Sequence, residues 1–426
     1  MQMENEKDSS RFSIILIISI LINLIFYLCY YSFQTIKYFK QKWLNIFNEL
    51  ILSIIHPTEI ISIFKIKYSL YNKKVPKSEL NQLAISLNDI DFCYATLNKV
   101  SRSFSVVIEQ LPECLKDSVC IFYLVLRGLD SIEDDMNYPD EKKIVLLRNF
   151  HKKLLINNWS IENIGDTKDY KILLENFFKI IHVFKTLDKN YQSVILDITE
   201  QMGNGMADFV GKTGSIDTID NYNLYCHYVA GLVGYGLSSL FTHSQLEDKN
   251  LYLNKELSNS MGLFLQKTNI IRDYLEDLQA GRTWWPKEIW INYASDLSQF
   301  HQDPNGQQSL ECLNHMVMDS FSHLSDVIQY LRLIKHPKIF EFCAIPQLMA
   351  IATLVQLYNN PLVFTSVVKI RKGLACELML NCSDIKQVEY YFSLFINKIE
   401  KKIPKYSNIN NKHMQELINK SKQLFN

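Results

Sequence analysis

Two acid-rich segments decide the fold and the chemistry of this chain: Asp130-Ser131-Ile132-Glu133-Asp134-Asp135 and Asn269-Ile270-Ile271-Arg272-Asp273-Tyr274-Leu275-Glu276-Asp277. Each segment follows a strongly apolar stretch whose spacing predicts a buried helix. Carboxylates rarely lie so close to an apolar core unless a counter-charge accompanies them. We therefore expect both segments to belong to a functional site.

The acidic side chains of each segment recur at helical spacing and form one stripe along its helix. The predicted ligands are Asp130, Glu133 and Asp134 in the first stripe, and Asn269, Asp273 and Asp277 in the second. Two facing stripes of oxygen ligands suit Mg²⁺, which takes carboxylates, keeps water and completes its shell with substrate phosphate. The segments therefore predict a site that binds a diphosphate through metal ions.

A structural ion-pair network is the alternative interpretation of the same residues, with Arg127 and Arg272 as the partners of the carboxylates. We favour a functional site because both acidic segments end apolar helices, and carboxylates with perturbed protonation cluster at such sites.

The composition narrows the fold class and excludes several functions. Lys plus Arg and Asp plus Glu both number 45, which gives no support to general nucleic-acid binding. Only 13 glycines and 10 prolines occur in 426 residues, so we expect one all-α domain, a helical bundle around a central cavity. The nine cysteines form no CxxC pair, which indicates a reducing compartment and no structural zinc.

The N-terminal region has the composition of a membrane anchor. Phe12–Tyr31 is almost wholly apolar, and about 20 helical residues span one bilayer core. A buried core helix is the alternative, but the segment has no polar face. Lys37, Lys40 and Lys42 follow it, so the positive-inside rule predicts a cytosolic body.

The rest of the chain is expected to be helical, with boundaries set by composition. We assign residues 1–36 to the N-terminal tail and anchor, 37–55 to a juxtamembrane segment, 56–404 to the catalytic body and 405–426 to a polar tail. Within the body, the patterns predict helices over 114–134, 222–241 and 258–277. Gly203 and Gly205 are expected to mark a kink, and Gly281 to end the third helix.

Seven sequence motifs, in order, carry a resemblance to a known family. They are the two acidic segments, the second extended back to Met261, and the stretches 101–104, 119–127, 225–234, 342–347 and 368–373. On these motifs the chain closely resembles the squalene synthases of the squalene/phytoene synthase family. The resemblance covers about residues 56 to 404 and implies the isoprenoid-synthase form of the helical bundle.

The resemblance also implies a reaction and its cofactors. The family joins two farnesyl diphosphates head to head into presqualene diphosphate, then ionises and rearranges this intermediate and reduces the cation with hydride from NADPH. It implies that Asp130, Asp134, Asp273 and Asp277 assist diphosphate loss through Mg²⁺. It further implies that Tyr225 removes a proton and that the ring of Phe342 stabilises a cation.

Basic residues match the positions that the family uses for NADPH or diphosphate. They are Arg102, Arg127, Arg272, Lys369 and Arg371. Arginine suits phosphate because its planar fork donates to two oxygens at once. No GxGxxG follows a predicted strand, so we expect a nucleotide site outside the Rossmann pattern.

The resemblance implies a single-pass protein of the endoplasmic reticulum membrane, a monomer with its catalytic domain in the cytosol. The chain departs from most family members because its anchor is predicted at the N-terminus rather than the C-terminus. Two alternatives stay open: a phytoene- or dehydrosqualene-type synthase without the reduction, and a non-catalytic, membrane-tethered helical protein of the same fold.

Overall fold

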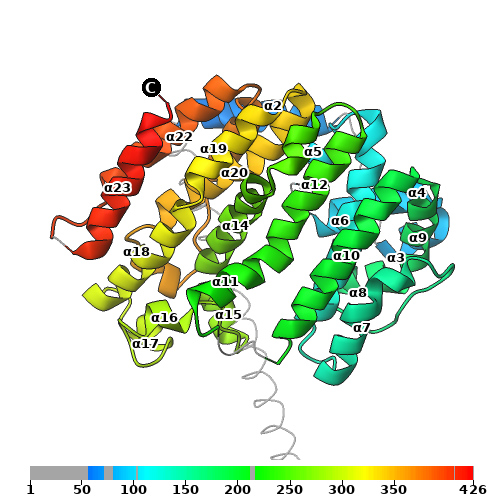
Figure 1. The fold of residues 1–426 in the computed structure, drawn as a ribbon, viewed down its shortest axis with the longest axis horizontal. Coiled ribbons are helices and arrows are strands. Elements are labelled where there is room, and N and C mark those ends of the chain that lie inside the picture. The colour runs from blue at the N-terminus through cyan, green and yellow to red at the C-terminus, as the bar shows by residue number, and fades with distance from the viewer. Residues whose placement is uncertain (1–55, 72–79, 102–103, 212–215, 407, 426) are drawn as a thin grey trace, which may run out of the picture. The chain divides into compact units, whose positions relative to one another are not determined.

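The structure is a computed structural model that describes residues 56–71, 80–101, 104–211, 216–406 and 408–425 (Figure 1). Within these ranges every regular element is a helix, which confirms the predicted all-α class. The chain divides into two compact units, residues 1–67 and 68–426. The predicted anchor, Phe12–Tyr31, and the juxtamembrane segment 37–55 lie outside the described residues.

In the first unit the described helix is α2 (Pro57–Tyr71), whose end extends past the unit boundary. The helices of the second unit are, in chain order, α3 (Leu80–Ser86), α4 (Asp89–Val100), α5 (Phe104–Ile108), α6 (Glu113–Asp134), α7 (Asp140–Lys153), α8 (Lys168–Glu175), α9 (Phe177–Thr186), α10 (Lys189–Phe209), α11 (Ile219–Cys226), η1 (His227–Gly231), α12 (Leu232–His243), α13 (Lys249–Leu253), α14 (Lys255–Arg272), α15 (Tyr274–Gln279), α16 (Lys287–Trp290), α17 (Gln299–Gln302), α18 (Gln307–Phe321), α19 (Leu324–Leu333), α20 (Pro337–Leu357), η2 (Pro361–Phe364), α21 (Lys372–Leu380), α22 (Ile385–Glu400) and α23 (Ile409–Gln423).

Helix α6 carries the first acidic segment and packs against α4, α9, α10 and α12. It is buried along most of its length, as its almost wholly apolar sequence predicts. Glu113 lies in its first turn, where negative charge is favourable to the helix dipole. The helix ends at Asp134, and the Asp135 carboxylate accepts hydrogen bonds from the backbone N–H groups of Asn137 and Gly165. This fixes the acidic end of α6.

Helix α10 is continuous through Gly203 and Gly205, so neither glycine ends it. The two glycines serve close packing instead. A Cβ on Gly203 would lie 2.3 Å from the carbonyl oxygen of Leu147 in α7, and one on Gly205 would lie 2.1 Å from the Tyr228 ring in η1. Sequence alone does not distinguish a glycine that breaks a helix from one that admits a neighbour.

The predicted helix over 222–241 is interrupted by a π-helical turn, η1. Such turns often occur at functional sites because they insert one extra residue and re-aim the side chains. Helix α14 comes close on this turn: a Cβ on Gly262 would lie 2.2 Å from the Ala230 carbonyl oxygen. In Figure 1 α10, α12 and α14 lie side by side, and they contact one another in that order.

The second acidic segment is divided between two helices, whereas the sequence predicted one. Helix α14 ends at Arg272, Asp273 has φ −91° and ψ 11°, and α15 starts at Tyr274. Backbone bonds of 2.9 Å still join the Asp273 N–H to the Asn269 carbonyl and the Asp277 N–H to the Asp273 carbonyl. The three residues therefore keep their spacing of one turn. Gly281, with φ +70°, confirms the predicted C-terminal cap.

A buried ion pair fixes α14 to α18. The Lys267 ammonium is 1% exposed and lies 2.7 Å from the Asp319 carboxylate. It also lies 5.3 Å from the centre of the Tyr222 ring in α11. One buried cation thus holds the helix of the second acidic segment against two others.

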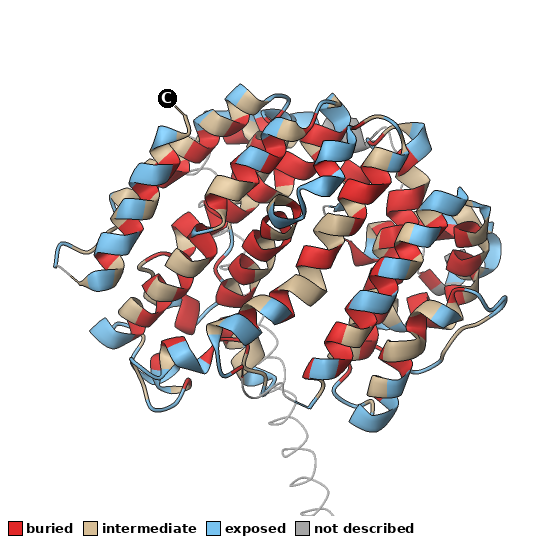
Figure 2. Cartoon of the chain, in the orientation of Figure 1, coloured by how far each residue is buried: buried red, intermediate tan, exposed pale blue. Residues whose placement is uncertain are grey.

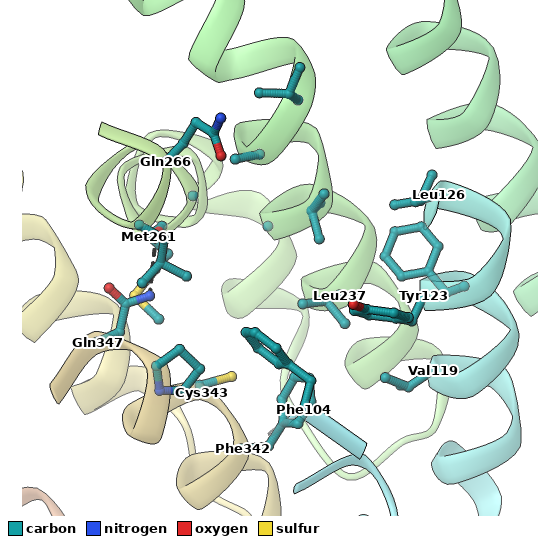
Figure 3. A pocket seen from close by; sticks show the side chains of 18 of the residues that line it. Phe104, Val119, Tyr123, Leu126, Leu237, Met261, Gln266, Phe342, Cys343 and Gln347 are labelled. Carbon is teal, nitrogen blue, oxygen red and sulfur yellow. Dashed lines mark hydrogen bonds between the residues drawn. The ribbon is translucent and has the colours of Figure 1, made fainter. Parts of the chain in front are cut away.

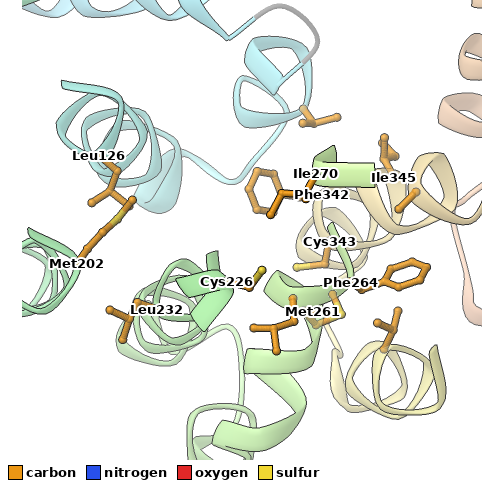
Figure 4. Close-up of a cluster of buried hydrophobic side chains, with 14 of the residues drawn as sticks. Leu126, Met202, Cys226, Leu232, Met261, Phe264, Ile270, Phe342, Cys343 and Ile345 are labelled. Atoms are coloured by element: carbon orange, nitrogen blue, oxygen red, sulfur yellow. The ribbon is translucent and has the colours of Figure 1, made fainter. Parts of the chain in front are cut away.

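Helix α20 is the long apolar core helix of this unit, and Pro346 lies inside it. It is long and apolar enough to cross a bilayer, but 78% of its most apolar window is buried against the rest of the protein. Figure 2 shows the buried residues that concentrate in the inner helices, and Figure 4 shows Phe342, Cys343 and Ile345 packed near Phe264 of α14. Within the described residues, therefore, the helix with the composition of a membrane span is a core element.

The C-terminal segment contains a docked helix. Helix α23 lies within residues 405–426, the predicted polar tail, and packs against α18 and α22. Met414 and Ile418 are buried, and the Asn410 amide donates a 2.7 Å hydrogen bond to the Tyr293 hydroxyl. The helix was missed because its apolar positions are few, although they recur four residues apart.

Candidate active site

A cavity of about 270 Å³ lies between α5, α6, η1, α12, α14, α19 and α20 (Figure 3). Most of its wall is apolar or aromatic, including Phe104, Leu126 and Phe342. Asp130 of the first acidic segment and Asn269 of the second both line it. The two segments, 139 positions apart at Asp130 and Asn269, therefore contribute polar side chains to one apolar chamber, as the sequence predicted.

Asp130 is paired with an arginine at the cavity wall. The Arg127 guanidinium lies 3.3 Å from the Asp130 carboxylate and within 6 Å of the ring centres of Tyr123 (5.7 Å) and Tyr170 (5.6 Å). Burial raises the pKa of Asp130 to about 6, although Arg127 opposes this shift. A second cation nearby would lower this raised pKa and favour the ionised carboxylate.

Glu133 and Asp134 complete the first stripe. Burial raises the pKa of both carboxyl groups, and the neighbouring Asp134 raises that of Glu133 further. Arg282 opposes the shift at Asp134. Like charges this close are unfavourable together unless a cation accompanies them.

Arg282 connects the two acidic segments directly. Its Nη1 atom lies 3.2 Å from Asp134 Oδ1, and its Nη2 atom lies 3.1 Å from Asp277 Oδ1. One guanidinium contacts both segments, so the carboxylates of α6 and α15 face each other. The sequence analysis named Arg127 and Arg272 as counter-ions but not Arg282, which lies five residues after the second segment.

The second segment holds its carboxylates in two different ways. Arg272 donates two hydrogen bonds of 2.7 Å to Asp273, a bidentate pair. Asp277 is more deeply buried, and burial raises its pKa to about 7 against the opposing charge of Arg282. Asn269, one turn earlier, lines the cavity. Asn269 and Asp277 thus lie on the side of α14 and α15 that meets the first segment, and Asp273 lies between them in the chain.

The donor set fits magnesium in kind. In the described part of the chain, no three His, Cys, Asp or Glu groups already converge as a preformed metal centre. The carboxylates are paired with Arg127, Arg272 and Arg282 instead, which is the ion-pair network considered from the sequence. Carboxylate and amide oxygens nevertheless match the preference of Mg²⁺, which uses few protein ligands and completes its shell with phosphate and water.

Tyr225 lies beside the acidic groups rather than in the cavity wall. Its ring stacks on Trp284, with ring centres 4.1 Å apart and planes 11° apart, and meets the Phe209 ring edge-on at 5.3 Å. Burial raises the pKa of its phenol well above the ordinary value, and Glu133 raises it further. Trp284 was not predicted from the sequence; its signal was the pair Trp284-Trp285, which follows Arg282 after one residue.

Phe342 lines the cavity, as predicted, from the second turn of α20. Its ring meets the Phe241 ring edge-on, with centres 5.9 Å apart. Close by, the Gln347 side-chain amide donates a 3.1 Å hydrogen bond to the Met261 carbonyl oxygen (Figure 3). That bond joins α20 to α14 at the cavity wall.

The predicted basic residues are not all brought to one place. Arg127 lines the cavity and Arg272 belongs to the second segment. Lys369 is exposed and Arg371, the N-cap of α21, is half-buried; neither lines the cavity. Arg102 lies outside the described residues.

Comparison with known proteins gives consistent matches over most of the chain. The sequence profile described as squalene/phytoene synthase matches residues 97–373. A squalene synthase of Botryococcus braunii is 47% identical over 355 residues, covering 82% of this chain and 75% of that protein. The squalene synthase of Homo sapiens is 44% identical, covering 82% of both chains. That of Saccharomyces cerevisiae is 43% identical, covering 84% of this chain and 80% of the relative.

The fold also matches a solved structure. The complex structure of TcSQS with the ligand E5700 superposes with a TM-score of 0.76 at 40% sequence identity. The match covers 79% of this chain and 98% of that one.

Proposed function

The chain belongs to the squalene/phytoene synthase family, and on that premise we propose that it catalyses the complete squalene synthase reaction. Two farnesyl diphosphates condense head to head into presqualene diphosphate, which is then rearranged and reduced to squalene. One observation carries the proposal. Arg282 contacts a carboxylate of each acidic segment, and both segments contribute a residue to the same apolar cavity.

Asp130, Glu133, Asp134, Asn269, Asp273 and Asp277 would hold Mg²⁺, which neutralises the charge that builds on a departing diphosphate. The arginines beside these ligands would neutralise part of the same charge. Arg127 lines the cavity next to Asp130, and Arg282 lies between the segments, so both are near the oxygens of a diphosphate bound there. A guanidinium can donate two hydrogen bonds to such a group.

The cavity wall protects the carbocations that follow loss of diphosphate. Apolar side chains exclude water, which would otherwise quench the cation. The face of an aromatic ring attracts a cation, and Phe342 supplies a ring at the wall.

Tyr225 is the proposed proton acceptor in cyclopropane formation. Its raised pKa keeps the phenol neutral, and a neutral phenol is a weak base. The proton must therefore pass on, and the departed diphosphate, bound at the neighbouring carboxylates, is the group able to take it.

NADPH supplies the hydride that ends the second half-reaction. We assign its phosphate groups to Arg102, Arg127, Arg272, Lys369 and Arg371, on the resemblance alone. Lys369→Ala with Arg371→Ala should leave the first half-reaction intact and accumulate presqualene diphosphate. Unchanged squalene output from this variant would remove both residues from the cofactor site.

We further propose the cellular setting. The N-terminal segment 1–36 would anchor the protein in the endoplasmic reticulum membrane, residues 37–55 would lie near its surface, and the catalytic body 56–404 would face the cytosol as a monomer, followed by the segment 405–426. An apolar product of this size dissolves in the bilayer, so an anchored enzyme releases it where it is soluble.

The two alternative functions are less well supported. The relatives of high identity are squalene synthases, which favours the branch that includes the reduction. A non-catalytic protein of this fold has no need of paired acidic segments, and here all six predicted ligands are present.

Product analysis tests the proposal directly. The full-length protein in detergent, given farnesyl diphosphate and Mg²⁺, should form squalene with NADPH and presqualene diphosphate without it. Dehydrosqualene formed in the presence of NADPH would favour the non-reducing alternative, and the absence of any condensation product would favour the non-catalytic one.

A further inference from the structure

A proline stands in the middle of the core helix that forms one wall of the cavity. Pro346 lies ten residues into α20, and the helix continues past it to Leu357. A proline inside a helix has no N–H to donate, and its ring crowds the preceding turn, so it destabilises the helix. A destabilising residue inside a buried helix calls for a compensating role.

The missing N–H affects one particular carbonyl. In an α-helix residue i donates to the carbonyl of residue i−4, so the group without its usual donor is the backbone carbonyl of Phe342. The proline ring lies beside that carbonyl, and Pro346 lines the cavity together with Phe342, Cys343 and Gln347. The under-bonded carbonyl therefore lies on the face of α20 that forms the cavity wall.

The distance of this wall from the ligands of the second segment is set by α14. Gln347 donates to the carbonyl of Met261, which precedes Asn269 by eight residues. At about 1.5 Å per residue, the contact lies about 12 Å from Asn269 along the helix. A diphosphate bound near Asn269 would leave its hydrocarbon chain toward the Met261 end of the cavity, where Gln347 of α20 contacts α14.

We propose that the Phe342 carbonyl, freed by Pro346, stabilises the carbocation by its dipole; this inference rests on the proposed function. A carbonyl oxygen carries partial negative charge, and in a dry cavity a preorganised dipole acts strongly on a developing charge. No bond to the oxygen forms or breaks. Phe342 then contributes twice, through its ring face and through its backbone.

The second half-reaction depends on this carbonyl more than the first. In the first, a double bond of the neighbouring farnesyl chain captures the cation as it forms. In the second, the cation must survive a rearrangement until hydride arrives. The longer-lived cation gains more from a fixed dipole.

The test uses substitutions that restore the N–H. Pro346→Val gives the helix its missing donor at similar side-chain volume, and Pro346→Ala does so with a smaller side chain. Both should raise the midpoint of thermal unfolding, since a helix-breaking residue is removed. Both should slow conversion of presqualene diphosphate to squalene about tenfold, the change expected from about 1.4 kcal/mol of lost stabilisation. Formation of presqualene diphosphate without NADPH should change by less than about threefold.

Pro337→Ala is the matched control, because Pro337 is at the start of the same helix, where proline is tolerated. It should change neither rate nor the unfolding midpoint. A Pro346→Val protein that makes squalene at the wild-type rate would overturn the inference, as would equal slowing of both half-reactions with a lowered midpoint. Wild-type protein that makes no squalene would refute the proposed function instead, so the two failures are distinguishable.

Discussion

The two acidic segments differ in how the protein holds their carboxylates. The first belongs to a single unbroken helix, α6, and its acids have raised pKa values through burial and mutual repulsion. The second extends over the break between α14 and α15, and Arg272 holds Asp273 in a bidentate pair. We infer that Glu133, whose pKa is raised by burial and by both Asp134 and Asp130, depends most on an added cation, whereas Asp273 is already partly neutralised by Arg272.

Removing one carboxylate from each segment gives the largest expected effect. Asp134→Asn and Asp277→Asn should each lower both half-reactions by about 10² to 10³-fold, because each half-reaction begins with ionisation of a diphosphate. Initial rates of presqualene diphosphate and squalene formation measure this. Asp208→Asn, which removes an exposed carboxylate paired with Arg148, should leave both rates unchanged. Full activity of either active-site variant would show that one segment suffices.

Removing the arginine shared by the segments should change the magnesium requirement. In Arg282→Gln, Asp134 and Asp277 lose a cation that competes with the metal, so the half-saturating Mg²⁺ concentration should fall about threefold to tenfold. Arg332→Gln, which breaks the surface pair with Glu389, is the control. A higher magnesium requirement in Arg282→Gln would instead mean that Arg282 assembles the ligands.

The pH dependence of stability should reveal the raised carboxyl pKa values. Asp130 and Asp277 have folded pKa values of about 6 and about 7, above the unfolded value of a carboxyl group. The folded protein therefore binds more protons, and this stability is present below about pH 4 and is lost as the pH rises through 6 to 7. Without magnesium, the unfolding midpoint should be at least about 2 °C higher at pH 5 than at pH 8.

Two comparisons sharpen this test. Asp277→Asn should reduce the difference between pH 5 and pH 8, because the group with the higher pKa no longer titrates. Added Mg²⁺ should stabilise the protein more at pH 8 than at pH 5, since metal binds the ionised carboxylates. An unfolding midpoint that rises from pH 5 to pH 8 without metal would mean that these carboxylates are ionised throughout that range.

The smallest expected effect separates the two arginine partners. Arg272→Lys removes the bidentate geometry at Asp273 and should lower the rate about threefold to tenfold, since lysine cannot reproduce the fork. Arg127→Lys keeps a cation beside Asp130, whose present contact is a longer 3.3 Å, and should lower the rate about twofold to threefold. The reverse order would show that the first segment is the more tightly organised.

The parts of the fold predicted from sequence are those that depend on local pattern. The bounds of α6 and the cap at Gly281 follow from apolar spacing and glycine chemistry, and the structure has them where predicted. The roles of Gly203 and Gly205 could not be predicted, because they depend on what α7 and η1 bring next to α10. The π-helical turn and the break at Asp273 likewise depend on neighbouring helices. At both places the apolar pattern of the sequence predicts a continuous helix.

In the candidate site, too, local pattern could be predicted from the sequence and contacts between distant elements could not. Its acidic residues were visible as two stripes, and the structure brings both to one cavity. Arg282, which joins them, and Trp284, which stacks on Tyr225, act across elements far apart in sequence. A long-range pairing of this kind leaves no periodic signal in a single sequence.

One measurement tests most directly whether the two segments act together. A crystal of the full-length protein with Mn²⁺ in place of Mg²⁺ and a farnesyl diphosphate analogue that cannot ionise would locate the metal by anomalous scattering. We predict metal peaks on the diphosphate bounded by carboxylates of α6 on one side and by Asn269, Asp273 or Asp277 on the other. A diphosphate held by arginines alone, with no metal at either segment, would contradict the account.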